Sequence, residues 1–134
     1  MKRSVLLLSV IACLASCNKG NPLTPALFGK WEVTRVYGGN IYPPDSVYKP
    51  GNGNILQLNS DSTFARYVKN VLTAQGIFHT RKNGFSTGQT SYDEIWFSPD
   101  TSFKSVITLN GRTLTLKPLI PDISTTDYQK MGDQ

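Results

Sequence analysis

Short stretches in which hydrophobic and polar residues alternate run through most of the chain after residue 29. Side chains at every second position of an extended strand point to the same face. Patterns of this kind predict strands at 30–37, 55–58, 63–69, 71–81, 94–97, 103–109, 113–116 and within 123–131. Only Thr24–Phe28, with Thr24 as cap and Pro25 in the first position, predicts a turn of helix. The pattern therefore predicts an all-β chain of about eight short strands.

Turn-forming residues separate these segments. Asn110-Gly111 lies between two alternating runs and predicts a hairpin, because both residues tolerate the positive φ of a type I′ turn. Residues 82–91 contain Asn83-Gly84 and Gly88 and predict a loop or a loose hairpin. A longer loop, Asn40–Asn54, is rich in Gly and Pro.

Sequential strands with short connections favour an antiparallel up-and-down β-barrel of about eight strands. Such a barrel leaves no exposed sheet edge and can enclose one small ligand. A Greek-key sandwich can be built from the same strands, and alternation alone does not distinguish the two folds.

The N-terminus has the order of a secretory signal peptide, with Lys2 and Arg3 before the apolar run 5–12. Leu14-Ala15-Ser16-Cys17 then resembles the lipobox of bacterial lipoproteins. This resemblance implies cleavage before Cys17 and acylation of Cys17, with palmitate for example. The expected organisation is a signal peptide at 1–16, a lipidated tether at 17–26 and a β-barrel domain at 27–134. A secreted protein cut elsewhere and a cytosolic protein with an apolar N-terminal strand are the alternatives.

The lipid anchor would make a membrane the main partner. An aspartate after the acylated cysteine is a retention signal for the inner membrane in some bacteria, and Asn18 stands there instead. We therefore expect attachment to the periplasmic face of the outer membrane.

The composition suits one globular domain. The chain has 134 residues and a formal charge of +5, and 39% of its residues are hydrophobic and 17% charged, which excludes a disordered tail. Lysines and arginines are spread without a basic stripe, so we expect no nucleic-acid partner and a monomer.

Leu27-Phe28-Gly29-Lys30-Trp31 resembles the glycine-x-tryptophan signature on the first strand of lipocalins. Leu56-x-Leu58, Asp61-x-Thr63-Phe64 and Gly76-x-Phe78 resemble the small lipocalin-like lipoproteins of Bacteroidetes, so that the similarity extends to about Met131. The resemblance implies that Trp31 plugs the closed end of the barrel and that a basic residue near the last strand, here Lys130, packs across it. Trp31 as an ordinary core aromatic of any β domain is the alternative.

Four side chains of the first strand share one face, and in a barrel we expect them to point inward as ligand-binding residues: Trp31, Val33, Arg35 and Tyr37. Arg35 is the candidate for holding an acidic group, because a guanidinium inside an apolar cavity requires a partner. A shift of the alternation by one residue would place it outside instead. Tyr42 and Tyr48 in the long loop are expected either to shape the mouth of the cavity or to pack on its rim.

The residues for catalysis or metal binding are sparse. His79 is the only histidine, no Gly-x-Ser-x-Gly motif is present, and the two cysteines, Cys13 and Cys17, belong to the predicted signal and lipidation site. We therefore expect a non-catalytic protein without a cofactor or a metal, which binds a small apolar or amphipathic molecule.

The alternative function is a solid-cored interaction module or inhibitor that acts as an accessory to an outer-membrane complex through the 40–54 loop. The interior of the barrel discriminates between the two functions. An open hydrophobic cavity favours ligand binding. An interior filled by five aromatic side chains favours the interaction module: Trp31, Phe64, Phe78, Trp96 and Phe103.

Overall fold

The computed structural model describes residues 23–40, 45–100 and 102–132. The predicted signal peptide, Cys17, Tyr42 and the tether up to residue 22 lie outside the described residues. Within the described ranges, no helix has the length and hydropathy needed to cross a membrane.

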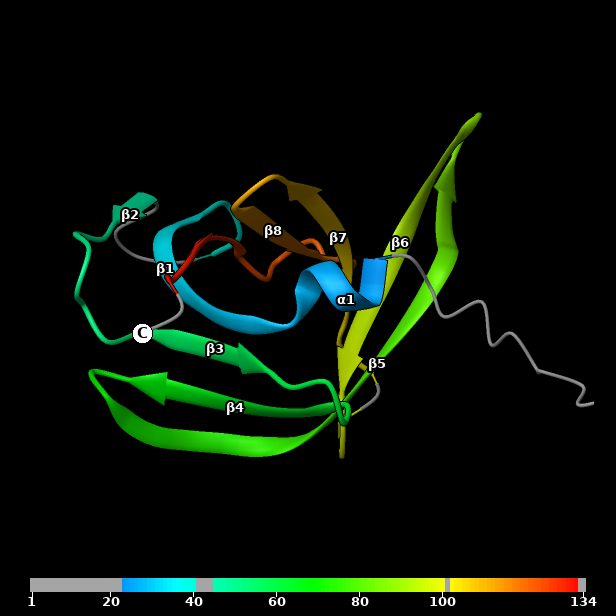
Figure 1. Cartoon of the computed structure of the whole chain (residues 1–134). Coiled ribbons are helices and arrows are strands. Elements are labelled where there is room, and N and C mark those ends of the chain that lie inside the picture. Colours follow the sequence, from blue (N-terminus) through cyan, green and yellow to red (C-terminus); the bar gives the residue numbers. More distant parts are fainter. Residues whose placement is uncertain (1–22, 41–44, 101, 133–134) are drawn as a thin grey trace, which may run out of the picture.

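One short helix precedes a series of antiparallel strands (Figure 1). The helix and the strands are α1 (Leu23–Leu27), β1 (Gly29–Tyr37), β2 (Asp45–Val47), β3 (Ile55–Leu58), β4 (Thr63–Val68), β5 (Val71–Thr87), β6 (Thr90–Phe97), β7 (Lys104–Asn110), β8 (Thr113–Pro118) and β9 (Thr125–Lys130).

The first and last strands close the sheet into a barrel. β1 pairs with β9 along one edge, and its other edge is shared by β3, over Gly29–Glu32, and β2, over Arg35–Tyr37. From β3 to β9 every strand pairs with the next one in the chain. Eight strands, β1 and β3–β9, thus form a closed antiparallel barrel with β2 as one extra strand. The predicted up-and-down barrel is confirmed, and the sandwich is excluded by the β1–β9 pairing.

The interior is packed at one end, where α1 lies. Leu27 and Trp31 are fully buried, and the indole Nε1 of Trp31 donates a hydrogen bond of 2.7 Å to the Leu27 carbonyl. The Lys130 Nζ lies 5.2 Å from the centroid of the Trp31 ring. Lys130 of the last strand therefore packs across Trp31. The buried cluster consists of Leu27, Trp31, Leu56, Leu58, Phe64, Phe78, Ile95, Ile107, Leu114, Leu116 and Tyr128.

β5 and β6 continue beyond the barrel as a hairpin arm (Figure 1). Their pairing runs out to Thr87 and Thr90, whereas β6 pairs with β7 only over Asp93–Trp96. Most of the segment 82–91, which the sequence predicts to be a loop or loose hairpin, is therefore strand, and only residues 88 and 89 form the turn.

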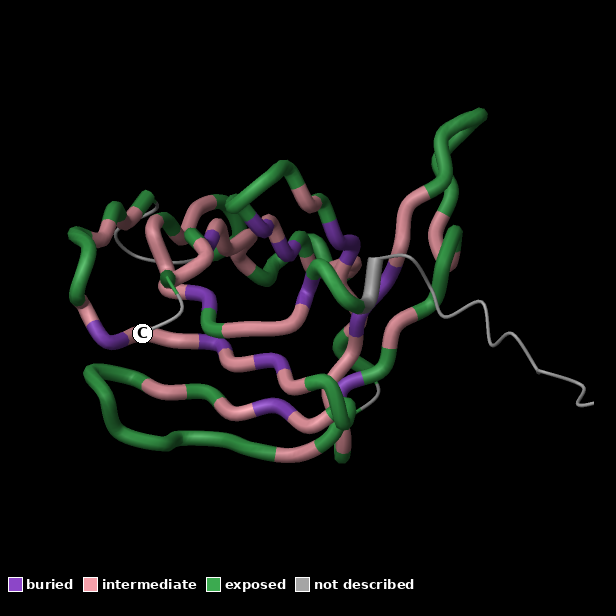
Figure 2. The backbone as a smooth tube through the Cα atoms, viewed as in Figure 1, coloured by how far each residue is buried: buried purple, intermediate pink, exposed green. Residues whose placement is uncertain are grey.

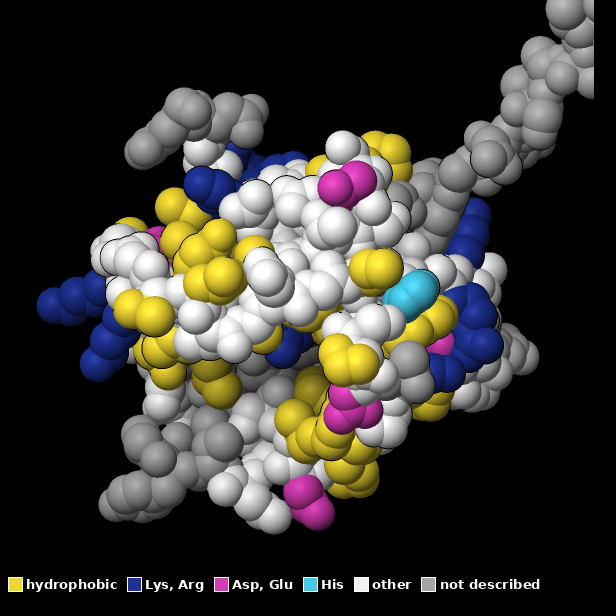
Figure 3. Space-filling view, turned by 90° about the horizontal axis from the view of Figure 1, so that it is seen from below, with side chains coloured by type: hydrophobic (Ala, Val, Ile, Leu, Met, Phe, Trp, Pro, Cys, Tyr) yellow, Lys and Arg dark blue, Asp and Glu magenta, His cyan; other side chains and the backbone are white. Residues whose placement is uncertain are grey.

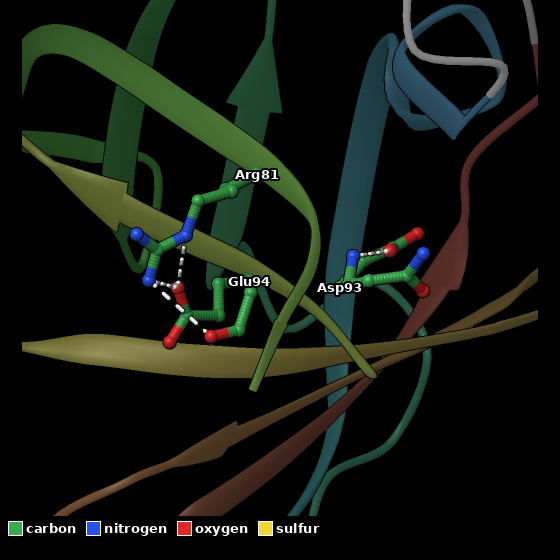
Figure 4. Close-up of polar contacts among 5 residues, drawn as sticks. Arg81, Asp93 and Glu94 are labelled. Atoms are coloured by element: carbon green, nitrogen blue, oxygen red, sulfur yellow. Dashed lines mark hydrogen bonds and ion pairs between the residues drawn. The ribbon is translucent and has the colours of Figure 1, made fainter. Parts of the chain in front are cut away.

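A β-bulge at the base of the arm accounts for this difference (Figure 4). Three residues of β5, from 82 to 84, lie opposite Asp93 alone. Glu94 is buried and accepts hydrogen bonds from Arg81 Nε and Nη2, at 3.0 and 2.6 Å, and Asp93 Oδ1 accepts one of 2.7 Å from the Asn83 amide. Asp93 accepts from the Asn83 amide within the bulge, and Glu94 holds the Arg81 side chain beside it, so Asn83-Gly84 bends the strand without ending it.

The hairpin predicted at Asn110-Gly111 is present between β7 and β8, with its turn one residue further along. Asn110 pairs with Thr113, so Gly111 and Arg112 form the turn. Of these residues only Gly111 has a positive φ, at 57°, whereas a type I′ turn needs positive φ at both central positions.

Candidate functional site

The end of the barrel away from the packed cluster is hollow. A cavity of about 520 Å³ lies there, with walls that are mostly apolar. Leu56, Leu116 and Tyr128 belong both to the buried cluster and to the cavity wall, so the packed end forms the floor of the cavity. Residues beside the connections between the later strands, Val68 and Phe103 among them, line its mouth. This is the size and character of a site for a small ligand.

Arg66 lines the cavity and brings a positive charge to its open, solvent-exposed part. On β4 it follows Phe64 by two positions and pairs with the buried Leu56, so its side chain shares the inner face of the sheet. The guanidinium carbon lies 4.3 Å from the ring centroid of Phe97 and 5.7 Å from that of Phe64. These are cation–π distances.

Within the described part of the chain, Arg66 forms no ion pair, since the ion pairs there join Arg35 to Asp45 and Arg81 to Glu94. Asp100 also lines the cavity, but its carboxylate accepts hydrogen bonds from the amide and hydroxyl of Ser102. The Arg66 guanidinium is therefore held by aromatic faces and is open to an anionic partner.

Two hydroxyl groups add polarity to the wall. The Ser124 Oγ is buried and has no hydrogen-bond partner among the described residues. The Tyr128 side chain is buried, and burial raises the pKa of its phenol, with the charge of Arg66 acting in the opposite direction. A neutral phenol and a free hydroxyl thus accompany the guanidinium.

Arg35 and Tyr37 lie on the outer surface of the barrel, so the prediction that they point inward is wrong. The register of β1 against β9 shifts between Val33 and Arg35, which makes Thr34 the extra residue of a β-bulge. One inserted residue moves each later side chain to the opposite face of a sheet. The shifted alternation is the alternative that the sequence leaves open.

On the outside, Arg35 connects β1 to β2. Its Nε and Nη2 donate to Asp45 Oδ1 and Oδ2 at 2.9 and 2.5 Å, and its guanidinium carbon lies 4.7 Å from the Tyr37 ring centroid. The hydrogen bonds from Arg35 lower the pKa of the Asp45 carboxyl, and the same contact raises the pKa of Arg35. This pair stabilises the attachment of the extra strand.

Among the other predicted ligand-binding residues, Val33 lines the cavity. Trp31 is fully buried in the packed end and does not reach the wall. The Tyr48 amide donates a hydrogen bond of 2.9 Å to a β1 carbonyl, which places Tyr48 beside the barrel and not in the wall. Tyr42 lies outside the described residues.

Arg66 was not among the predicted site residues, although its sequence pattern indicates an inward position. Phe64, Arg66 and Val68 alternate on the strand predicted at 63–69. The same reasoning that was applied to Arg35 selects Arg66 once Phe64 is recognised as a core residue.

The long loop after β1 is fixed to the barrel near the mouth. The Glu32 carboxylate accepts hydrogen bonds from the amides of Gly51 and Gly53, at 2.9 and 3.1 Å. The Asn70 amide, in the turn between β4 and β5, donates to the Gly53 carbonyl at 2.9 Å. The loop and this turn therefore form one connected part of the rim.

Among the described residues, no three His, Cys, Asp or Glu side chains lie close enough together to hold a metal ion. His79 is on the outer surface, where it stacks on Trp96 with 5.3 Å between ring centroids, and its Nε2 lies 3.0 Å from Ser98 Oγ. Compared with protein-family models, curated proteins and solved structures, the chain matches none of them.

Proposed function

We propose that the chain is a non-catalytic, lipocalin-like binding protein, attached to the periplasmic face of the outer membrane through an acylated Cys17. Its barrel holds a small amphipathic molecule with an apolar body and an anionic head. One observation carries the binding function, namely the cavity of about 520 Å³ in which the Arg66 guanidinium has no carboxylate partner within the described residues.

An apolar wall and a single cation suit such a ligand. The apolar body gains from leaving water, and an anion placed against Arg66, which is exposed, exchanges the guanidinium's hydrogen bonds to water for charge-assisted ones. The phenol of Tyr128, a residue of the cavity wall, offers a further hydrogen bond to the head group.

The interior supports ligand binding over the solid-cored interaction module. Of the five aromatic residues that could fill the barrel, Trp31, Phe64 and Phe78 are buried in the packed end. Trp96 stacks on His79 outside the barrel, and Phe103 is exposed at the mouth.

Two fluorescent probes of similar size test the proposal. The anionic probe is 1-anilinonaphthalene-8-sulfonate, and the neutral probe is N-phenyl-1-naphthylamine. Both are expected to bind the full chain. Arg66→Gln should weaken binding of the sulfonate about 10- to 100-fold, since a hydrogen bond to a charged group contributes about 1.5–3 kcal/mol, and should leave the neutral probe unaffected.

Arg35→Gln is the matched control, because it removes the same charge from the outer surface and should change neither affinity. Val33→Phe narrows the cavity and should weaken both probes. Equal binding of the sulfonate by the Arg66 and Arg35 variants, or normal binding by a folded Val33→Phe protein, would contradict the proposed site.

The anchor has a separate test. The mass of the protein isolated from native membranes should show acyl chains on Cys17, and Cys17→Ser should abolish them. A protein that starts at another residue and carries no lipid would overturn this part of the proposal without affecting the cavity.

A further inference from the structure

Exposed apolar side chains surround the mouth of the cavity. They come from three separate places, the turn between β4 and β5, the connection before β7 and the connection before β9. Val71, Leu72 and Phe103 have exposed fractions of 65%, 47% and 48%. We define the mouth patch by its five residues: Val68, Val71, Leu72, Phe103 and Ile123.

The turn between β4 and β5 presents its apolar residues on a defined backbone. Val68 pairs with Val71, and the two residues between them, Lys69 and Asn70, have φ of 51° and 67°. Positive φ at both central positions is the geometry of a type I′ hairpin turn. The first residues of β5 form a continuous exposed run in Figure 2, since β5 pairs with β6 only from Phe78 onwards.

Basic side chains accompany this patch. Lys69 lies in the turn itself, and Lys49 belongs to the loop that the Asn70–Gly53 hydrogen bond of 2.9 Å fastens to it. Figure 3 shows hydrophobic side chains gathered around a hollow in this face, with basic side chains extending from the end of the molecule where β4 and β5 meet.

Acidic groups at the rim are fewer and partly engaged. Asp100 lines the mouth but accepts hydrogen bonds from Ser102, and Asp122 precedes Ile123 in the connection to β9. Glu32 is bound to the Lys49 loop through the amides of Gly51 and Gly53, so the loop and the turn between β4 and β5 together carry two lysines against one carboxylate.

We propose that the mouth patch docks on an anionic lipid bilayer. The apolar side chains enter the boundary between head groups and acyl chains, Lys49 and Lys69 lie against the anionic head groups, and the cavity opens toward the membrane. A lipid bilayer is deformable, so it can contact the three separate places of the mouth patch at once. The mouth of the cavity between them would then face the apolar part of the bilayer. The proposal rests on the surface of the rim and does not depend on which molecule the cavity holds.

The test places an environment-sensitive nitrobenzoxadiazole label on single cysteines of the full chain, after Cys13→Ser and Cys17→Ser. Leu72→Cys and Phe103→Cys report on the patch. Ile77→Cys is the matched control, because Ile77 has a similar exposed fraction, 50%, on the same strand β5 but pairs with Thr63, at the end of β4 away from the turn. Vesicles of phosphatidylcholine with one quarter phosphatidylglycerol are compared with vesicles of phosphatidylcholine alone.

With anionic vesicles, we expect a blue shift and stronger emission from the labels at 72 and 103, and no change at 77. Lys49→Glu together with Lys69→Glu should weaken the response at least tenfold, because each lysine near an anionic surface contributes about fivefold in affinity. Equal responses at 72 and 77, or none at 72 from vesicle-bound protein, would overturn the proposal. So would a concentration-dependent response at 72 without vesicles, which would show that a second copy covers the patch.

Probe binding separates this inference from the proposed function. Leu72→Ser should retain binding of anilinonaphthalene sulfonate in solution and lose the vesicle response. A silent label with normal probe binding would overturn docking alone, and a vesicle response without probe binding would overturn the cavity site alone.

Discussion

The contact between Trp31 and α1 makes a quantitative prediction for Trp31→Phe. In the native protein the indole Nε1 donates to the Leu27 carbonyl at 2.7 Å, and both residues are fully buried. Phenylalanine keeps an aromatic ring in the core but has no donor. The substitution therefore tests whether this hydrogen bond holds the helix on the closed end of the barrel.

The expected loss has two parts. Replacing indole by phenyl removes roughly 40 Å² of buried apolar surface, or about 1 kcal/mol. The Leu27 carbonyl is then buried without a partner, which costs about 1–3 kcal/mol. Trp31→Phe should therefore lower the free energy of unfolding by about 2–4 kcal/mol, a large share of the stability of a domain of this size.

Urea unfolding followed by circular dichroism measures this loss. Amide hydrogen exchange adds a local measurement, because the Phe28 amide donates to the Pro25 carbonyl at 3.3 Å and should exchange faster when α1 loosens. Trp96→Phe is the control. Trp96 is half-buried on the outside of the barrel, and its replacement should cost less than about 1 kcal/mol.

The reasoning would be refuted by a loss below about 1 kcal/mol for Trp31→Phe, or by equal losses for the two tryptophan variants. Unchanged exchange at Phe28 in a destabilised variant would show that the hydrogen bond does not hold the helix.

Three further predictions concern other parts of the barrel. Burial raises the pKa of Tyr128, so the unfolded chain loses this phenol proton at a lower pH than the folded protein does. The free energy of unfolding should therefore fall as pH rises above about 10. Urea titrations should show a flatter pH dependence for Tyr128→Phe. Because Arg35 lowers the pKa of Asp45, the ion pair stabilises the protein above the ordinary pKa of 3.8 and is lost as pH falls through the lower folded value. The protection factors of β2 amides, corrected for the intrinsic exchange rate at each pH, should therefore be lower in acid than at pH 7. A Cβ at Gly84 would lie 2.7 Å from the Glu94 carboxyl carbon, so Gly84→Ala should cost about 1–3 kcal/mol in thermal unfolding and reduce amide protection in the arm.

Most strands and their antiparallel order were predictable because their signals are local, whereas closure depends on the distant β1–β9 pairing and alternation alone also allows a sandwich. Alternation marks most of the strands, and turn residues mark their ends, as at Asn110-Gly111. β2 was not predictable in this way, since its three residues lie in a Pro-rich loop and pair with the part of the β1 edge that β3 leaves free.

The bulges limited the prediction of the site. Arg35 follows Val33 by two positions, as Arg66 follows Phe64, so the two arginines have equivalent patterns in the sequence. What separates them is the extra residue in β1, and its place is set by pairing with β9, which lies about ninety residues away. Side-chain direction after a bulge depends on this distant partner and cannot be derived from alternation.

Because the barrel is solid at the Trp31 end and hollow at the other, folding and the proposed ligand binding depend on largely different positions. Ser105 and Thr126 line the cavity without belonging to the buried cluster. Substituting them should change which ligand is preferred, with little loss in the free energy of unfolding. Leu56, Leu116 and Tyr128 belong to both the buried cluster and the cavity wall, so substitutions there would change ligand preference and lower the stability of the fold together.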